Sequence, residues 1–202
     1  MRKLVLATRN RGKIREISAI LDHLPLKVTG MEEYPSLPPV AEEGSTFAEN
    51  AQKKALTVAR FSGEMALADD SGLVVDELGG EPGVHSARFA GPGADDRANN
   101  ALLLKRLAGV PPEKRQAAFH CAMVLAFPDG RTFLVEETCR GRILDAPRGE
   151  GGFGYDPLFF YEPTGMTFAE MDPAAKNEVS HRGKALRRMV KLLEELLSRG
   201  EL

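Results

Sequence analysis

A strand-turn-strand pattern over residues 118–143 constrains the fold of this chain more than any other feature. Apolar side chains at every second position from Phe119 to Phe127 alternate with smaller or polar ones, which is the period of a β-strand. The segment FPDGRTF then predicts a tight turn into a second strand that ends near Ile143. The fold must therefore contain an antiparallel strand pair.

Helical periodicity occurs on both sides of this hairpin. We expect a strand over residues 3–7, a helix over about 14–24 that is ended by Pro25, a capped helix over 46–60, a helix over 98–107 and a final helix over 180–197. A short apolar run over 158–161 follows a glycine-dense loop. Mixed helices and strands with a hairpin predict an α/β or α+β sheet with helices packed on it.

Two other stretches are expected to lack regular structure. Residues 31–44 are rich in proline and acid and are interpreted as a surface excursion, and residues 80–97 are punctuated by glycine and proline. Between them, residues 66–68 are expected to end a buried strand, the sequence DDSG to form a turn, and residues 73–75 to begin another strand.

Composition limits the classes of protein that this chain can belong to. With 202 residues, 43% hydrophobic and 28% charged, the chain is within single-domain range, and we expect one domain over 1–202. A formal net charge of -2 gives no overall basic field, which argues against a nucleic-acid polymer as partner. The apolar run near the N-terminus is too short for a signal peptide or a membrane span, so a cytoplasmic location without membrane partner is expected.

The two cysteines, Cys121 and Cys139, are too few for a disulfide scaffold. They also have no metal-ligating partner at short spacing. We interpret both as reduced core residues.

The first polar cluster is the segment TRNRGK, from Thr8 to Lys13, between the first strand and the first helix. A hydroxyl, an amide and cations beside the first amides of a helix suit a polyphosphate. The alternative is a solvated helix start, because threonine and asparagine cap helices in any case. The segment does not match the Walker pattern.

The second cluster is acidic and comes from separate segments. Glu42 and Glu43 precede the capped helix, while Asp69 and Asp70 follow a short apolar run. Two adjacent carboxylates raise each other's proton affinity unless a cation separates them, and Mg²⁺ prefers a few carboxylates together with waters and phosphates. An exposed acidic loop and an ordinary Asp-Ser-Gly turn are the alternatives.

The third cluster is GGFGYDP, residues 151–157. Its glycines permit close backbone approach, and Phe153 and Tyr155 offer flat faces on which a base could stack. The alternative is a hairpin loop whose two aromatic rings return to the core.

The fourth cluster is the sequence KNEVSHRGKALRR around the start of the final helix. Arg182 and Lys184 there oppose the helix dipole unless an anion lies nearby. We interpret Arg187 and Arg188 as solvated surface charge, and favour a functional role for His181 and Arg182. His120, within a strand, is interpreted as structural or as a support for the site.

These segments together resemble the inosine triphosphate pyrophosphatase family. The resemblance lies in LATRNRGKIREI, TFAENAQKKA, LADDSGLVVDELGGEPGVHSARFAG, GGFGYDPLFF and SHRGKAL, in this order from residue 4 to about 186. It implies an elongated, two-lobed single domain with a long mixed sheet flanked by helices, a nucleotide cleft between the lobes, and a homodimer. It also implies hydrolysis of ITP, dITP or XTP to the nucleoside monophosphate and pyrophosphate with Mg²⁺.

The resemblance also implies roles for individual residues. Asp70 would bind the metal and accept the proton of the attacking water, with Glu42 or Glu43 and Asp69 assisting the metal. The residues expected to contact substrate are Thr8, Arg9, Asn10, Arg11, Gly12, Lys13, Lys54, Ser71, Phe153, Gly154, Tyr155, Asp156, Lys176, His181 and Arg182. Among them, His181, Arg182 and the backbone of 153–156 are predicted to recognise the 6-keto group of the base.

Two rival functions remain open at this point. A nucleotide sensor that binds without cleaving would need the phosphate loop and the aromatic loop but not the acidic pair. A metal-dependent phosphatase would use similar carboxylates and release orthophosphate instead of pyrophosphate.

Overall fold

The computed structural model describes residues 2–202 and divides them into two compact units. The first unit contains residues up to Asp70, Cys121–Glu137 and Arg182–Leu202; the second contains Ser71–His120 and Thr138–His181. Strands β3, β4 and β5 each contribute residues to both units. Whether the two units form the predicted single domain, with a cleft between its lobes, depends on how the units are arranged. Both statements therefore stay predictions.

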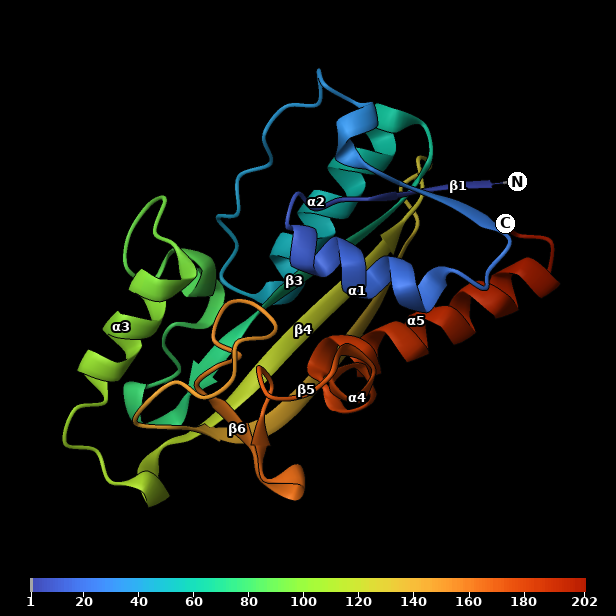
Figure 1. Ribbon diagram of the computed structural model, residues 1–202. Helices are drawn as coiled ribbons and strands as arrows, with labels where there is room; N and C mark the ends of the chain where they lie inside the picture. The colour runs from blue at the N-terminus through green and yellow to red at the C-terminus, as the bar shows by residue number, and fades with distance from the viewer. Residues whose placement is uncertain (1) are drawn as a thin grey trace. The chain divides into compact units, whose positions relative to one another are not determined.

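Seven strands and five α-helices occur within residues 2–202 (Figure 1). The strands are β1 (Arg2–Leu6), β2 (Leu26–Gly30), β3 (Met65–Val75), β4 (Gln116–Ala126), β5 (Thr132–Ile143), β6 (Phe159–Tyr161) and β7 (Met166–Thr167). The helices are α1 (Arg11–Leu21), α2 (Phe47–Ser62), α3 (Asp96–Arg106), α4 (Pro173–Val179) and α5 (His181–Ser198). The predicted hairpin is confirmed as β4 and β5, and every predicted helix is present.

The strands form one mixed sheet in the order β2-β1-β3-β4-β5-β6-β7. Strand β1 pairs in parallel with both β2 and β3, whereas β6 pairs antiparallel with β5 and β7. The predicted mixed α/β class is therefore confirmed.

In the first unit the two faces of the sheet are covered by different helices. Side chains at alternate positions of β1 and β3, such as Leu4 and Leu67, pack with α1 and α5 in one apolar cluster. The intervening positions, such as Val5 and Ala68, pack with the alanine-rich side of α2 in another. This alternation determines which helix each side chain of β3 meets.

The second unit has a core of its own. Phe119, Phe159 and Phe168 form an aromatic cluster with centroids 4.6 to 5.8 Å apart, together with Leu103 and Leu107 on and after α3. The glycine-rich loop and α4 belong to this unit. This core therefore supports the segments predicted to contact the base.

Three features differ from the sequence-based expectations. The predicted turn at DDSG is wrong, because residues 65–75 form one continuous strand. Local turn preference is overridden here, since both aspartates find cations on the helices that cover the sheet. Strands β2 and β7 and helix α4 were not predicted, because five, two and seven residues are too short for a clear period.

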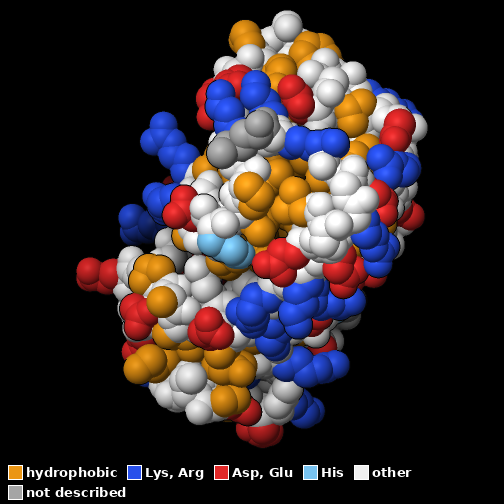
Figure 2. All heavy atoms as spheres, turned by 90° about the vertical axis from the view of Figure 1, so that its right-hand side faces the viewer, with side chains coloured by type: hydrophobic (Ala, Val, Ile, Leu, Met, Phe, Trp, Pro, Cys, Tyr) orange, Lys and Arg blue, Asp and Glu red, His pale blue; other side chains and the backbone are white. Residues whose placement is uncertain are grey.

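The surface carries charges of both signs, in agreement with the small formal net charge of -2. Figure 2 shows basic and acidic side chains interspersed with apolar ones on one face. Within residues 2–202, no helix has the length and apolar character needed to cross a membrane.

Both cysteines are buried and free, as predicted.

Candidate active site

Asp69 and Asp70 point to opposite faces of strand β3. Asp69 continues the positions of Met65 and Leu67, which face α1 and α5. Asp70 continues the positions of Ala66 and Ala68, which face α2. The period of two along a strand therefore separates the adjacent charges and gives each its own partners.

The Asp69 carboxylate is completely buried and held by two cations. The Arg182 Nε donates to its Oδ2 at 2.9 Å, and the Lys13 ammonium pairs with its Oδ1. The Cys121 thiol donates to Oδ2 at 3.2 Å. This set of contacts fixes the start of α1 and the start of α5 on β3.

Ionisation of this buried group depends on its partners. Burial alone would raise the pKa of Asp69, but the charges of Arg182 and Lys13 outweigh it and hold the pKa well below its usual range. Burial and the neighbouring Asp69 charge raise the pKa of the Cys121 thiol well above normal. Asp69 is therefore a carboxylate and Cys121 a neutral thiol.

These contacts bear on two predicted roles, which stay predictions. Asp69 was predicted to assist a metal, but its side chain is fully buried and both oxygens contact cations. Arg182 was predicted to read the base, but its side chain is only 2% exposed and binds Asp69 and, at 2.6 Å, Glu16. The geometry fits positioning roles for both, because a buried charge needs its counter-ion.

Glu16 and Cys121 were not identified from the sequence as parts of this group. Each has an indirect signal. Glu16 is an acidic residue of α1 that lies near the apolar residues Ile17 and Ile20. Cys121 lies in β4, the strand next to β3. Neither signal reveals the partner, which is supplied by another part of the chain.

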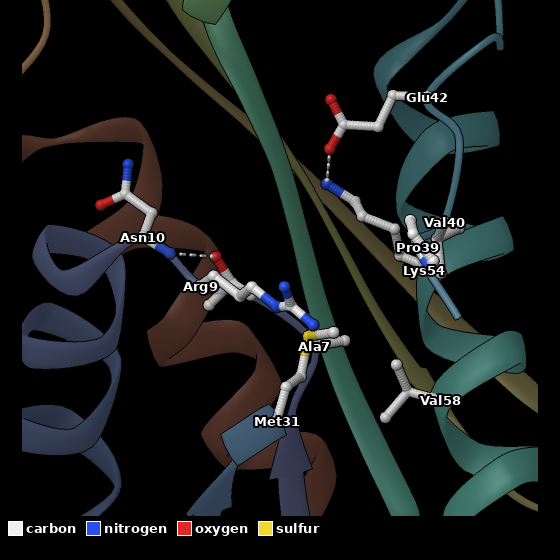
Figure 3. Close-up of a pocket in the computed structure, with 10 residues that line it drawn as sticks. Ala7, Arg9, Asn10, Met31, Pro39, Val40, Glu42, Lys54 and Val58 are labelled. Carbon is white, nitrogen blue, oxygen red and sulfur yellow. Dashed lines mark hydrogen bonds and ion pairs between the residues drawn. The ribbon is translucent and has the colours of Figure 1, made fainter. Parts of the chain in front are cut away.

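Asp70 lies in a second group with Lys54 on α2 and Glu42 in the preceding loop. The Lys54 ammonium is 3.1 Å from Asp70 Oδ1 and 2.9 Å from Glu42 Oε1. Figure 3 shows the charged ends of Glu42 and Lys54 meeting beside the pocket. These two carboxylates and one ammonium come from three separate segments, as the sequence predicted for the acidic cluster.

The two candidate metal helpers are distinguished by their surroundings. Glu42 is turned toward Lys54 and has a side chain 33% exposed, whereas the Glu43 side chain is 80% exposed and pairs with Lys53 at 3.5 Å. The structure thus favours Glu42, although the sequence left both open.

On the predicted magnesium role, Glu42→Gln should raise the magnesium concentration needed for half-maximal hydrolysis of the expected purine nucleoside triphosphates by about tenfold, as for other changes that disturb the support of a metal. Glu43→Gln is the matched control and should leave this requirement unchanged. Titration of magnesium in an activity assay measures both. Equal effects of the two substitutions would contradict the assignment.

Asp70 is predicted to be the metal-binding base, and its surroundings bear on that prediction. Burial raises its pKa, and the Lys54 and Lys13 charges offset this only in part. Its Oδ2 is buried and has no hydrogen-bond partner among residues 2–202, which is costly unless a ligand supplies one. Within the same residues no group of three or more His, Cys, Asp or Glu side chains gathers, so a divalent cation here would need substrate oxygens, as Mg²⁺ commonly does.

A pocket of about 330 Å³ adjoins this group, a volume within the range of small-ligand sites. It is lined by Ala7, Thr8, Arg9, Asn10, Met31, Pro39, Val40, Glu42, Lys54 and Val58. Five residues predicted to contact substrate or metal therefore share one cavity: Thr8, Arg9 and Asn10 from the loop after β1, Lys54 from α2, and Glu42 from the loop before α2. The segment 31–44 was interpreted as a surface excursion, but it forms part of the pocket wall.

The loop from Thr8 to Lys13 is organised by a helix cap. The Asn10 Oδ1 accepts from the amides of Gly12 at 2.9 Å and Lys13 at 3.1 Å, as an N-cap does. These two amides are therefore already bonded within the loop. The pocket receives Thr8 and Arg9 instead, while Arg11 is exposed and Lys13 turns to Asp69.

In the second unit, Lys176 on α4 organises the glycine-rich loop. Its buried ammonium is 2.6 Å from Asp156 Oδ2 and 4.7 Å from the centroid of the Phe153 ring. The Phe153 amide donates to the same oxygen of Asp156 at 2.9 Å, and the Gly154 amide donates to Asp96 at 2.6 Å. These contacts connect the loop to α4 and to Asp96 on α3, and Phe153 is half-buried.

The remaining predicted residues of this unit differ in exposure. Tyr155 is buried, its hydroxyl donates to Ser86 O at 2.8 Å, and burial raises its pKa, so its ring does not offer the predicted stacking face. His181 is also buried and stacks on Phe119 at 4.7 Å. Ser71 lies on β3 and is half-buried.

The mixed sheet and the pocket define an α/β protein whose cavity combines a polar strand-to-helix loop with Glu42 and Lys54, and the Lys54 ammonium also contacts Asp70. Residues 4–192 match the Ham1 family. The chain belongs to this family, which confirms the resemblance found in its sequence motifs.

Individual relatives support the same assignment. A dITP/XTP pyrophosphatase of Geobacter sulfurreducens is 56% identical over 92% of this chain and 94% of its own. One of Desulforamulus reducens is 53% identical over 96% of both chains. The solved structure of a HAM1 protein from Coxiella burnetii is 40% identical, covers 96% of this chain and 100% of its own, and has a TM-score of 0.88.

Proposed function

We propose that this protein is a nucleoside triphosphate pyrophosphatase that hydrolyses dITP, XTP and ITP to the nucleoside monophosphate and pyrophosphate. It thereby removes these non-canonical purine nucleotides from the nucleotide pool. The observation that carries the proposal is Asp70, whose buried Oδ2 has no partner within residues 2–202 and whose Oδ1 contacts Lys54 beside the pocket. The names of the relatives, dITP/XTP pyrophosphatase, supply the substrate class.

We assign the triphosphate to the first unit. Thr8 and Arg9 line the pocket together with Lys54, so a hydroxyl and the Arg9 guanidinium are available to phosphate oxygens, with the Lys54 ammonium beside them. Asn10 and Gly12 shape the loop through the helix cap, and Arg11 adds an exposed cation. Lys13 acts mainly on Asp69 in this arrangement.

We assign Mg²⁺ to Glu42, which lines the pocket, and to Asp70, which contacts Lys54 beside it. The donor set fits, because Asp70 has an unused buried oxygen and Glu42 contacts the same Lys54 ammonium as Asp70. When bound, the cation would withdraw charge from the phosphate oxygens and the departing pyrophosphate.

The chain's own residues then carry out the proton transfer. An attacking water forms a bond from its oxygen to the α-phosphorus, the bond from that phosphorus to the bridging oxygen of the β-phosphate breaks, and pyrophosphate leaves. Asp70 accepts the proton that the water releases. Burial raises the pKa of Asp70 above its ordinary value, which makes it a stronger base than an exposed aspartate.

We assign the purine to residues of the second unit. Phe153 is half-buried and offers a face for stacking, and the backbone of residues 153–156 is held by Asp156 and Asp96. Lys176 and His181 support this loop and the neighbouring core. A fixed donor pattern would discriminate the 6-keto group from the 6-amino group of adenine, since a mispaired buried group costs about 1 to 3 kcal/mol.

The product distinguishes the proposal from its rivals. Incubation of the protein with dITP or XTP and magnesium should release pyrophosphate and the monophosphate in equal amounts. Orthophosphate with the diphosphate would indicate a phosphatase, and binding without turnover would indicate a sensor. Glu43→Gln is a suitable control protein in this assay. The homodimer and the cytoplasmic location stay predictions, which sedimentation and cell fractionation test.

A further inference from the structure

Lys54 contacts three oxygens that surround its ammonium group. These are Glu42 Oε1 at 2.9 Å, Asp70 Oδ1 at 3.1 Å and the backbone oxygen of Asp69 at 3.1 Å. A lysine ammonium has three N–H donors, so this set uses all of them. The Lys54 side chain is only 12% exposed, which shows that the ammonium is enclosed and not a surface charge.

The same three oxygens are of the types that bind hard divalent cations. Carboxylate and backbone carbonyl oxygens from separate segments are the usual protein ligands of such ions. The ammonium therefore lies where it neutralises the two carboxylates proposed to hold magnesium. An additional cation at Asp70 would meet a unit positive charge at hydrogen-bonding distance from the same carboxylate.

We propose that Lys54 competes with magnesium for Glu42 and Asp70, so that the metal binds tightly only after substrate phosphates have drawn the ammonium away. This rests on the magnesium site of the proposed function. Lys54 thus acts as a positioning residue that makes metal binding depend on the nucleotide. A consequence is that the free enzyme binds magnesium weakly and that bound nucleotide strengthens magnesium binding.

Lys53 provides a matched control on the same helix. Its ammonium pairs with Glu43 at 3.5 Å, and its side chain is 48% exposed. Removal of Lys53 therefore changes the charge of the protein and of α2 by the same amount, without changing the group around Asp70.

The test is a calorimetric titration of the full-length protein with magnesium chloride in the absence of nucleotide. Lys54→Met, which keeps an unbranched apolar stem, should bind magnesium about tenfold or more tightly than the wild type, because a unit charge beside the ligands is removed. Lys53→Met should bind as the wild type does. Unchanged or weaker binding by Lys54→Met, in a protein with a normal thermal transition, overturns the proposal.

Two further variants make the result independent of one substitution. Lys54→Gln should also tighten magnesium binding, and it replaces Lys54→Met in the test if that variant does not fold. Unchanged or weaker magnesium binding by folded Lys54→Gln would then overturn the proposal. Glu42→Gln in the Lys54→Met background should abolish the gain, and a persisting gain would show that the metal binds elsewhere. Since no nucleotide is present, these results are separate from the release of pyrophosphate that tests the proposed function.

Discussion

Asp70→Asn is expected to reduce turnover of dITP or XTP by about a hundredfold or more, as loss of a general base does. The amide is nearly isosteric with the carboxylate and can still contact Lys54, but it cannot accept the proton of the attacking water. It also removes one of the two carboxylates assigned to the metal. Steady-state kinetics at saturating magnesium measures the effect.

Asp76→Asn is the control for Asp70→Asn. Asp76 follows the same strand, β3, and is exposed, so its substitution should leave turnover within about twofold of wild type, because it touches no part of the site. Near-normal turnover of Asp70→Asn, with a thermal transition like that of wild type, would remove Asp70 from the proposed role.

Arg182→Met is expected to lower the free energy of unfolding by about 3 to 5 kcal/mol, the range for breaking a buried ion pair by removing one partner. The guanidinium contacts both Asp69 and Glu16, and Asp69 is fully buried. Without Arg182, Glu16 loses this ion pair and the buried Asp69 keeps only Lys13 as counter-ion. Urea denaturation measures the change.

Arg188→Met on the same helix is the control for Arg182→Met. Arg188 pairs with Glu137, and its side chain is 58% exposed, so the loss should be below about 1 kcal/mol. If Arg182→Met were as stable as wild type but had lost its preference for ITP over ATP, Arg182 would read the base as the sequence had suggested. A large loss of stability with preserved preference supports the positioning role.

The sequence predicts the elements whose period is long and clear. The β4–β5 hairpin follows from strict alternation and a tight turn, and α2 follows from the capping box, in which Thr46 accepts from the Glu49 amide at 3.1 Å. Short elements such as β2 have too few residues to establish a period. The course of β3 also could not be read locally, because Asp-Ser-Gly favours turns until tertiary contacts are known.

The sequence predicts which residues belong to the candidate site better than it predicts the role of each residue. Residue types and motifs identify Lys54 and the loop after β1, which line one pocket, and Asp70, which contacts Lys54 beside it. The buried role of Arg182 depends on Glu16, which is 166 positions away in the chain. A partner at such a distance leaves no local pattern, so charge alone suggested contact with substrate.

Because both cysteines are buried, the rate at which a thiol reagent labels each of them measures how often its surroundings open. Cys121 and Cys139 are each at most 2% exposed, and the Cys121 thiol is kept protonated beside Asp69. Since the thiolate is the reactive form, reagents such as dithiobisnitrobenzoate should label neither residue until its surroundings open. The two labelling rates then report separately on opening of the first unit, through Cys121, and of the second, through Cys139.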